Sequence, residues 1–258
     1  MTAQEIYEAL CKGIAVPPET CDTFKAGDPG RQVKKAAVAM FATVDLIREV
    51  TAWGADLLIV HEPTYYNHLD KRIESAVAER KRALLEESGL VIFRYHDHPH
   101  LAAEDMICKG GLAAMGLTGK VEKTENFGTY LFTPDTPITA REAAGRMAER
   151  QGLQFVRVTG ELDYPTRRIA VCFGTPGHLD EAVEDDRFDL IMTGEICEWG
   201  TAERVRDAAA LGLHKSLMVM GHIGSERDGM KYVAEQMKTA FPEIETAYFE
   251  CGEVFRAL

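Results

Sequence analysis

The strongest constraint on the fold is a regular alternation of short apolar runs with longer segments of helical composition. The runs have strand length and are bounded by Gly, Pro or charged residues. They are AAVAMFAT (36–43), DLLIV (56–60), LVIFRY (90–95), RIAVCF (168–173), DLIMT (189–193) and SLMVM (216–220). Helices are expected over 44–53, 70–88, 102–116, 139–151, 200–211 and 225–240. This repetition predicts an α/β fold with largely parallel sheets.

The rhythm is broken by KVEKTENFGTYLFTPDT (120–136), which predicts a crossing into a second lobe. The apolar stretch TAYFECGEVFRAL (246–258) is expected to return to the first lobe as a strand. We therefore expect residues 1–122 plus 216–258 to form a discontinuous α/β lobe that carries the metal ligands. Residues 123–215 would form the second α/β lobe.

Charge and composition exclude several classes of partner. The chain has 29 Lys and Arg against 41 Asp and Glu, a formal net charge of −12. Nucleic-acid affinity depends on clustered cations, so no nucleic-acid partner is expected. The six cysteines contain no C-x-x-C pair, and no run approaches the roughly 18 apolar residues of a membrane span. The amphipathic, acid-containing N-terminus is unlike a signal peptide, so we expect a cytoplasmic protein without a membrane partner.

Potential metal ligands follow directly after several predicted strands. His61 and Glu62 come after DLLIV, the histidine-rich YHDHPH (95–100) follows LVIFRY, and His222 follows SLMVM. Glu195 comes after DLIMT, where it could also cap the next helix. The carboxyl ends of parallel strands meet at one edge of a sheet, so these side chains should gather there if the strands share a sheet.

The spacing of these residues suggests how they could share a ligand. In an extended chain, His96, His98 and His100 would point to one face, although the proline among them favours a turn. His222 and Glu226 are four positions apart, so they share a face if a helix begins there. Imidazoles and carboxylates together bind divalent first-row ions.

Other features have simpler interpretations. His68, His178 and His214 have no companions in the sequence and are expected to be structural. FGTPGH (173–178) lacks the patterns of a phosphate-binding loop, so a tight turn is favoured over contact with an anionic substrate. Thr139 with Glu142 predicts a capping box, and Ser225 could cap the last helix.

The ordered motifs DLLIVHEPTYY, GLVIFRYHDHPH, DLIMTGEICEW and GHIGSE, which follow Asp45 in a strand-to-helix step, resemble the Nif-three-like family, also called GTP cyclohydrolase I type 2 homologues. The similarity spans the chain from about residue 36 to its C-terminus. The resemblance implies a Nif-three-like fold of two α/β lobes with mixed, largely parallel sheets. It also implies a dinuclear metal site in the cleft between the lobes and a homohexamer.

The resemblance also implies a set of metal ligands. They are His61, Glu62, His96, His100, His222 and Glu226. The chain departs from the family at Glu62, where the family has histidine, and at His100, where it has aspartate. Both substitutes can bind a divalent ion, so we expect the site to survive in a divergent subfamily. Two ions per chain are implied, and the ligand set does not distinguish Zn, Mn, Fe, Ni and Mg.

Neighbouring residues receive supporting roles in this interpretation. His98 would orient His96 and His100 or meet solvent, and Asp97 or Asp105 could accept the outer imidazole N–H groups. By resemblance, Glu195 would lie near the site.

The leading functional hypothesis is a dinuclear metal-dependent hydrolase of a small anionic or nucleotide-like metabolite. Glu226 would bridge the ions, and Glu62 would share that work or act as general base. The alternative is a non-catalytic hexameric metal-binding or regulatory protein with protein or metabolite partners. A metallohydrolase of the polymerase-and-histidinol-phosphatase type is disfavoured, because that family places its H-x-H near the N-terminus.

Overall fold

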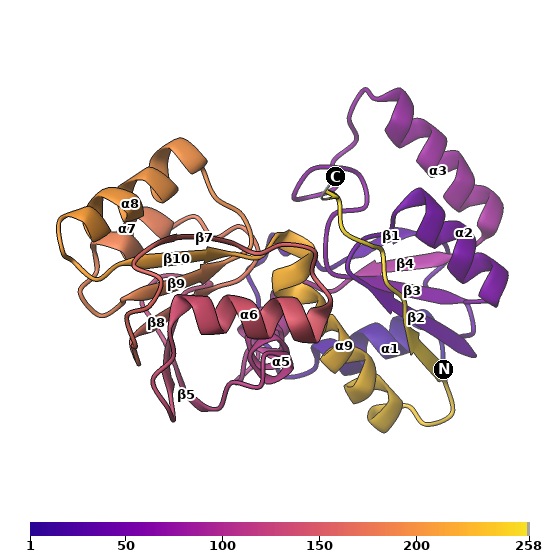
Figure 1. The fold of residues 1–258 in the computed structure, drawn as a ribbon. Coiled ribbons are helices and arrows are strands. Elements are labelled where there is room, and N and C mark those ends of the chain that lie inside the picture. The colour runs from indigo at the N-terminus through magenta and orange to yellow at the C-terminus, as the bar shows by residue number, and fades with distance from the viewer. Residues whose placement is uncertain (257–258) are drawn as a thin grey trace. The chain divides into compact units, whose positions relative to one another are not determined.

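The computed structural model describes residues 1–256 and divides the chain into two compact units (Figure 1). Unit 1 comprises Met1–Ile107 and Gly229–Gly252, and unit 2 comprises Cys108–Asp228 and, of the described C-terminal residues, 253–256. The first boundary falls in helix α5 (Met106–Ala114) and the second in helix α9 (His222–Ala240).

These boundaries differ from those expected from the sequence, which were 1–122 plus 216–258 and 123–215. Strands β5 (Gly119–Lys123) and β10 (Ser216–Val219) were assigned to the first lobe, but both are hydrogen-bonded into the sheet of unit 2. His222 and Glu226 therefore belong to unit 2, whereas the other four predicted ligands belong to unit 1.

Unit 1 is built on a five-stranded sheet in the order β1-β4-β3-β2-β11. Within residues 1–256, the β11–β2, β2–β3 and β3–β4 pairings are parallel, and β1 joins β4 antiparallel. The strands are β1 (Phe24–Ala26), β2 (Lys35–Ala39), β3 (Leu57–Val60), β4 (Val91–Arg94) and β11 (Glu245–Tyr248). The helices within this unit are α1 (Ala3–Cys11), α2 (Val44–Trp53), α3 (Ala76–Ser88) and α4 (Asp97–Leu101).

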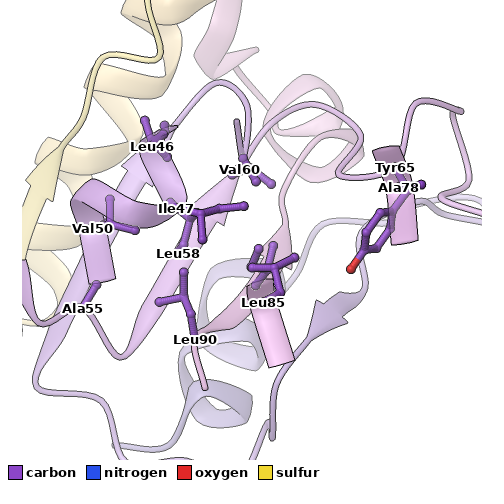
Figure 2. Packing of buried hydrophobic residues seen from close by; sticks show 14 residues of the cluster. Leu46, Ile47, Val50, Ala55, Leu58, Val60, Tyr65, Ala78, Leu85 and Leu90 are labelled. Carbon is purple, nitrogen blue, oxygen red and sulfur yellow. The ribbon is translucent and has the colours of Figure 1, made fainter. Parts of the chain in front are cut away.

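The core of unit 1 lies where α2 and α3 pack on one face of this sheet (Figure 2). Leu46 and Val50 of α2 and Leu85 of α3 contact the alternate strand residues Leu58 and Val60. Side chains alternate between the faces of a strand, so the remaining apolar strand positions are buried on the opposite face. Figure 1 shows α1 and the C-terminal part of α9 on that opposite side.

Unit 2 contains a six-stranded sheet in the order β5-β6-β8-β9-β10-β7. Within the described residues, only the β8–β9 and β9–β10 pairings are parallel, so this sheet is mixed rather than largely parallel. The further strands are β6 (Tyr130–Pro134), β7 (Arg157–Gly160), β8 (Ile169–Cys172) and β9 (Leu190–Thr193). Helices α7 (Leu179–Glu184) and α8 (Glu203–Ala210) cover one face, α6 (Ala140–Gln151) lies on the other, and a π-helical turn, η1 (Glu198–Ala202), precedes α8 (Figure 1).

The six apolar runs all contain strands, and the longer helical segments all contain helices. The capping box of Thr139 and Glu142 is confirmed. Ser225 is not a helix cap, because α9 already begins at His222; its Oγ accepts from Gly174 N and donates to His222 O. Residues 70–75 are not helical, since Ser75 caps α3.

The first part of the C-terminal stretch returns to unit 1 as a strand, because β11 pairs in parallel with β2, whereas residues 253–256 are assigned to unit 2. The strand ends at Tyr248, and residues 257–258 of the predicted stretch lie outside the described residues. Among residues 1–256, no helix combines the length and apolarity needed to cross a bilayer.

Candidate metal-binding residues

Unit 1 brings three of the predicted ligands together. His61 follows β3, and His96 and His100 follow β4, its parallel neighbour, so all three lie at one edge of the sheet. Their ring centroids are 4.7 Å apart for His61 and His96, 5.1 Å for His61 and His100, and 5.2 Å for His96 and His100. One candidate ligand atom from each ring lies within 4.8 Å of the other two. We refer to these residues as the imidazole cluster.

The backbone that presents two of these rings is helical, so His96, His98 and His100 do not share one face as they would in an extended chain. His96 is the N-cap residue of α4, and His100 lies one turn further along. Residues four apart share a helix face, which places the rings of His96 and His100 together and turns His98 elsewhere. His98 is buried at 4% exposure, so it does not meet solvent.

Asp22 explains why α4 forms, and nothing in the sequence pattern identified it. This fully buried carboxylate accepts hydrogen bonds from the backbone N–H groups of His96, Asp97 and His98 at 2.7, 2.9 and 2.9 Å. It also lies 2.6 Å from His98 Nδ1. Burial acts to raise the pKa of Asp22, but the hydrogen bonds from His98 and the three N–H groups outweigh burial and lower it. A carboxylate from outside the helix thus satisfies its first-turn donors.

Each ring of the imidazole cluster is held by an acceptor at Nδ1. These contacts are His61 with Tyr95 O at 3.1 Å, His96 with Asp97 Oδ1 at 2.9 Å, and His100 with Asp105 Oδ2 at 2.8 Å. The predicted partners Asp97 and Asp105 are confirmed. Because carbonyl and carboxylate oxygens only accept, a neutral ring must carry its proton on Nδ1 and present the lone pair of Nε2. That is the tautomer in which imidazoles bind a metal ion through Nε2.

Burial and hydrogen bonding keep this arrangement in the required protonation state. Burial lowers the pKa of His96, which favours the neutral ring that a metal ligand needs. Burial would raise the pKa of Asp97, but hydrogen bonds from His96 and from Thr20 Oγ1, at 2.6 Å, bring it well below its usual range. Asp97 is therefore a carboxylate acceptor under ordinary conditions.

Glu62 lies beside this cluster and is paired with a second residue that the sequence reasoning missed, Arg94. Glu62 Oε1 is 3.9 Å from His96 Nε2, and its Oε2 is 3.5 Å from Arg94 Nη2. Arg94 is fully buried and also donates from Nε to His61 O at 2.9 Å and from Nη1 to His68 O. The charged residue in the apolar run LVIFRY was the signal for this role, because a buried guanidinium needs a partner.

Unit 2 places the other two predicted ligands on one helix face. His222 and Glu226 occupy the first turns of α9, which follows β10, and His222 Nε2 is 3.1 Å from Glu226 Oε2. The predicted helical start is confirmed, and the two atoms are close enough to bind one ion together.

Glu195 contacts this pair. His222 Nδ1 lies 2.7 Å from Glu195 Oε1 and 3.1 Å from Thr175 Oγ1. Glu195 thus contacts Nδ1 of His222 in the same way that Asp97 contacts Nδ1 of His96. In this orientation, Nε2 of His222 points toward Glu226.

The loop FGTPGH is the tight turn expected, and it packs on Glu226. Gly174 has φ +71°, and a Cβ at this position would lie 2.3 Å from Glu226 Oε1. Only glycine avoids both the strained backbone and the collision. The loop thereby packs closely against the Glu226 carboxylate and carries Thr175 to His222.

The remaining histidines lie in different surroundings. His178 lies 3.4 Å from Glu181, and His214 is held at 2.7 Å by Glu161. The ring of His68 lies 5.7 Å from that of His96, nearer to the imidazole cluster than its isolated place in the sequence suggested.

The fold and these residues define an α/β protein with a candidate metal-ligand set in each unit. The family model of Duf34/NIF3 (NGG1p interacting factor 3) matches residues 21–252, and the chain belongs to this family. Similar sequences include the GTP cyclohydrolase 1 type 2 homolog of Pyrococcus abyssi, 26% identical over 257 residues and covering 93% of this chain and 95% of that protein. The homolog of the same name from Chlamydia pneumoniae is 25% identical over 245 residues, covering 90% of both.

A solved structure with the same fold is that of a Bacillus cereus protein related to NIF3. It matches with a TM-score of 0.75 at 14% identity, covering 99% of this chain and 98% of that chain.

Proposed function

We propose that this chain is a divalent-metal-binding protein and a metal-dependent hydrolase of a small anionic or nucleotide-like metabolite. The observation that carries the proposal is the imidazole cluster, in which each Nδ1 is held by an acceptor and one candidate ligand atom from each ring lies within 4.8 Å of the other two. His61 is buried, His96 and His100 are partly buried, and an imidazole whose Nδ1 is held by a carbonyl or carboxylate is typical of a metal ligand.

The proposed ligands are the six residues predicted from the sequence. They are His61, Glu62, His96, His100, His222 and Glu226. Support comes from the imidazole cluster in unit 1 and, independently, from the 3.1 Å separation of His222 Nε2 and Glu226 Oε2 in unit 2. Membership of the Duf34/NIF3 family and the resemblance of the motifs support two ions per chain and assembly into a homohexamer.

The chemistry divides between the ions and the chain. Bound divalent ions would supply positive charge that lowers the pKa of water and stabilises negative charge developing on a substrate. Tyr95 O, Asp97 and Asp105 keep the protons of the cluster on Nδ1, and Glu195 does the same for His222. We assign Glu62 Oε1 as the atom that accepts a proton from the attacking water or joins the ligands.

The pairing of Glu62 with Arg94 favours a second candidate function. A carboxylate engaged by a buried guanidinium is a weaker base, which suits a non-catalytic metal-binding or regulatory protein. Measuring both the activity and the metal content of Glu62→Gln distinguishes a hydrolase from a non-catalytic metal-binding protein. Loss of activity with the metal retained supports the hydrolase, whereas a parent protein that binds metal and hydrolyses nothing supports the regulatory protein.

The test is a hydrolysis screen with metal-loaded protein against phosphoesters, nucleotides and cyclic amides. The names of the sequence relatives make GTP the first nucleotide to include. His96→Ala and Glu226→Ala serve as inactive controls, and His178→Ala serves as a matched control outside both ligand sets. Turnover that is lost in the first two variants and kept in the third is the expected result. Equal turnover in all four proteins would mean that the activity comes from a contaminant.

A further inference from the structure

The loop between β3 and α3 presents an aromatic side chain from an unfavourable backbone conformation. Tyr66 has φ +69°, in the left-handed region that bulky residues rarely adopt. The residue is 56% exposed, so burial of its ring offsets little of this cost. Strained residues of this kind persist only where the surrounding structure imposes them, and they cluster at ligand-binding and catalytic sites.

Side-chain hydrogen bonds hold the backbone on both sides of Tyr66. Asp70 Oδ1 accepts from Tyr65 N at 2.6 Å, and Asn67 Nδ2 donates to Tyr65 O at 3.3 Å. Asn67 also pairs with the backbone of Lys71, donating from Nδ2 to Lys71 O and accepting at Oδ1 from Lys71 N, both at 2.8 Å. The loop is therefore preorganised, so a ligand that binds Tyr66 does not have to order it.

Lys81 lies against the ring of Tyr66 from the protein side. Its Nζ is 5.2 Å from the ring centroid and donates to Thr64 O at 2.6 Å. A cation on the face of an aromatic ring is attracted to it, and Lys81 is only 4% exposed. The contact therefore fixes the orientation of the Tyr66 ring and leaves its exposed surface as a flat apolar platform.

The same loop is attached to the imidazole cluster. Arg94 Nη1 donates to His68 O, and the ring of His68 lies 5.7 Å from that of His96. Tyr66 is four positions from Glu62, so the Cα atoms of these two residues are at most about 14 Å apart. A nucleotide is long enough to place its base on Tyr66 and its phosphates beside the cluster.

We propose that Tyr66 stacks against the aromatic heterocycle of the substrate and thereby selects nucleotide-like metabolites over other small anions. This inference rests on the proposed function and adds to it the residue that binds the non-reacting end of the substrate. Stacking on an aromatic side chain strengthens binding by about 5- to 150-fold for each base. Every base has a π face, so Tyr66 selects the class of compound rather than one particular base.

The experiment is a calorimetric titration of the metal-loaded full chain with GMP and with ribose 5-phosphate, which is the same sugar phosphate without the base. We expect the parent to bind GMP at least about 5-fold more tightly than ribose 5-phosphate. Tyr66→Ala should abolish this preference without changing the affinity for ribose 5-phosphate. Tyr66→Phe, which keeps the ring, should retain it. Phe155→Ala removes an exposed aromatic residue of unit 2 and should also retain it.

Tyr66→Asn separates binding from folding, because asparagine adopts the left-handed conformation more readily than tyrosine does. This variant should unfold at a urea concentration close to that of the parent and keep its metal content, yet lose the preference for GMP. A parent without the preference, or equal GMP affinity in the parent and Tyr66→Ala, would overturn the inference. Unchanged GMP affinity with a smaller assembly in Tyr66→Ala would assign the ring to a contact between copies of the chain instead.

The titration and the hydrolysis screen can fail separately. A parent that prefers GMP through Tyr66 but hydrolyses nothing would overturn the hydrolase and support the stacking site. A parent that hydrolyses a compound of the screen but binds GMP and ribose 5-phosphate equally would overturn the stacking site and leave the proposed function intact.

Discussion

The two candidate ligand sets are built in opposite ways. The imidazole cluster of unit 1 depends on residues distant in sequence: Asp22 caps α4 from 74 positions away, and Tyr95 O holds His61 from 34 positions away. The pair in unit 2, His222 and Glu226, is four positions apart on one helix, and that helix itself sets the spacing. The geometry of the imidazole cluster should therefore depend on the folding of unit 1. The geometry of His222 and Glu226 should depend on the residues that contact the first turns of α9.

The carboxylates that hold the histidines of the two sets also differ in burial. The Asp97 carboxylate that holds His96 is 14% exposed, whereas the Glu195 carboxylate that holds His222 is 53% exposed. Hydrogen bonds shielded from water are stronger and costlier to break. We therefore expect substitutions around the cluster to reduce stability and metal affinity together, and substitution of the exposed Glu195 to affect affinity alone.

The largest effect is expected from Asp22→Ala. It leaves three backbone N–H groups and His98 Nδ1 without their acceptor in a buried place, which should cost ~3–5 kcal/mol of unfolding free energy. Urea denaturation measures the loss, and elemental analysis should show reduced metal content. Asp22→Asn retains one acceptor oxygen and should lose less. A stable Asp22→Ala protein would show that α4 does not depend on this long-range cap.

The pH dependence of stability tests the burial of Lys81 in unit 1. Burial lowers the pKa of this lysine from 10.5 to about 8, and its Nζ donates to Thr64 O at 2.6 Å. Between these values the unfolded chain binds the extra proton, so unfolding free energy should rise with pH from about 8 to 10.5, by at most ~3 kcal/mol. Lys81→Met should remove that rise. If the unfolding free energy of the parent and of Lys81→Met changed with pH in the same way, burial would not lower the pKa of Lys81.

Gly174→Ala tests the loop that packs on Glu226 in unit 2. The new Cβ would meet Glu226 Oε1 at 2.3 Å and adopt φ +71°, so we expect a loss of about 2 kcal/mol with weaker metal binding. Gly177 lies in the same loop with nothing within 4 Å of its Cβ position. Thermal unfolding should show little change for Gly177→Ala, and equal losses in the two variants would refute the close packing on Glu226.

Glu195→Ala should have the smallest effect. Removing the acceptor at His222 Nδ1 should weaken metal binding about 10-fold, with stability changed by less than ~0.5 kcal/mol because the carboxylate is half-exposed. The metal affinity is measured by calorimetric titration, and the unfolding free energy is measured by urea denaturation. Glu195→Gln, which keeps an acceptor oxygen, should fall between the parent and the alanine variant. Unchanged affinity in Glu195→Ala would remove Glu195 from the site.

The contrast between the sets also explains what could be predicted from the sequence. The α/β order, the six apolar runs and the helical spacing of His222 and Glu226 depend on local patterns, and the structure contains them all. Helix α4 could not be predicted, because its five residues are held by Asp22 and have no helical pattern of their own. The unit boundaries were displaced because strand pairing, which places β5 and β10 in unit 2, is a non-local property.

Metal content per chain, determined by elemental analysis of protein purified without chelator, tests the central claim most directly. The comparison needs the parent, a variant with His96→Ala and His100→Ala, and a variant with His222→Ala and Glu226→Ala. We predict about two divalent ions in the parent and fewer in each variant. A parent that carries no ion, even after incubation with Zn, Mn or Fe, would contradict the account.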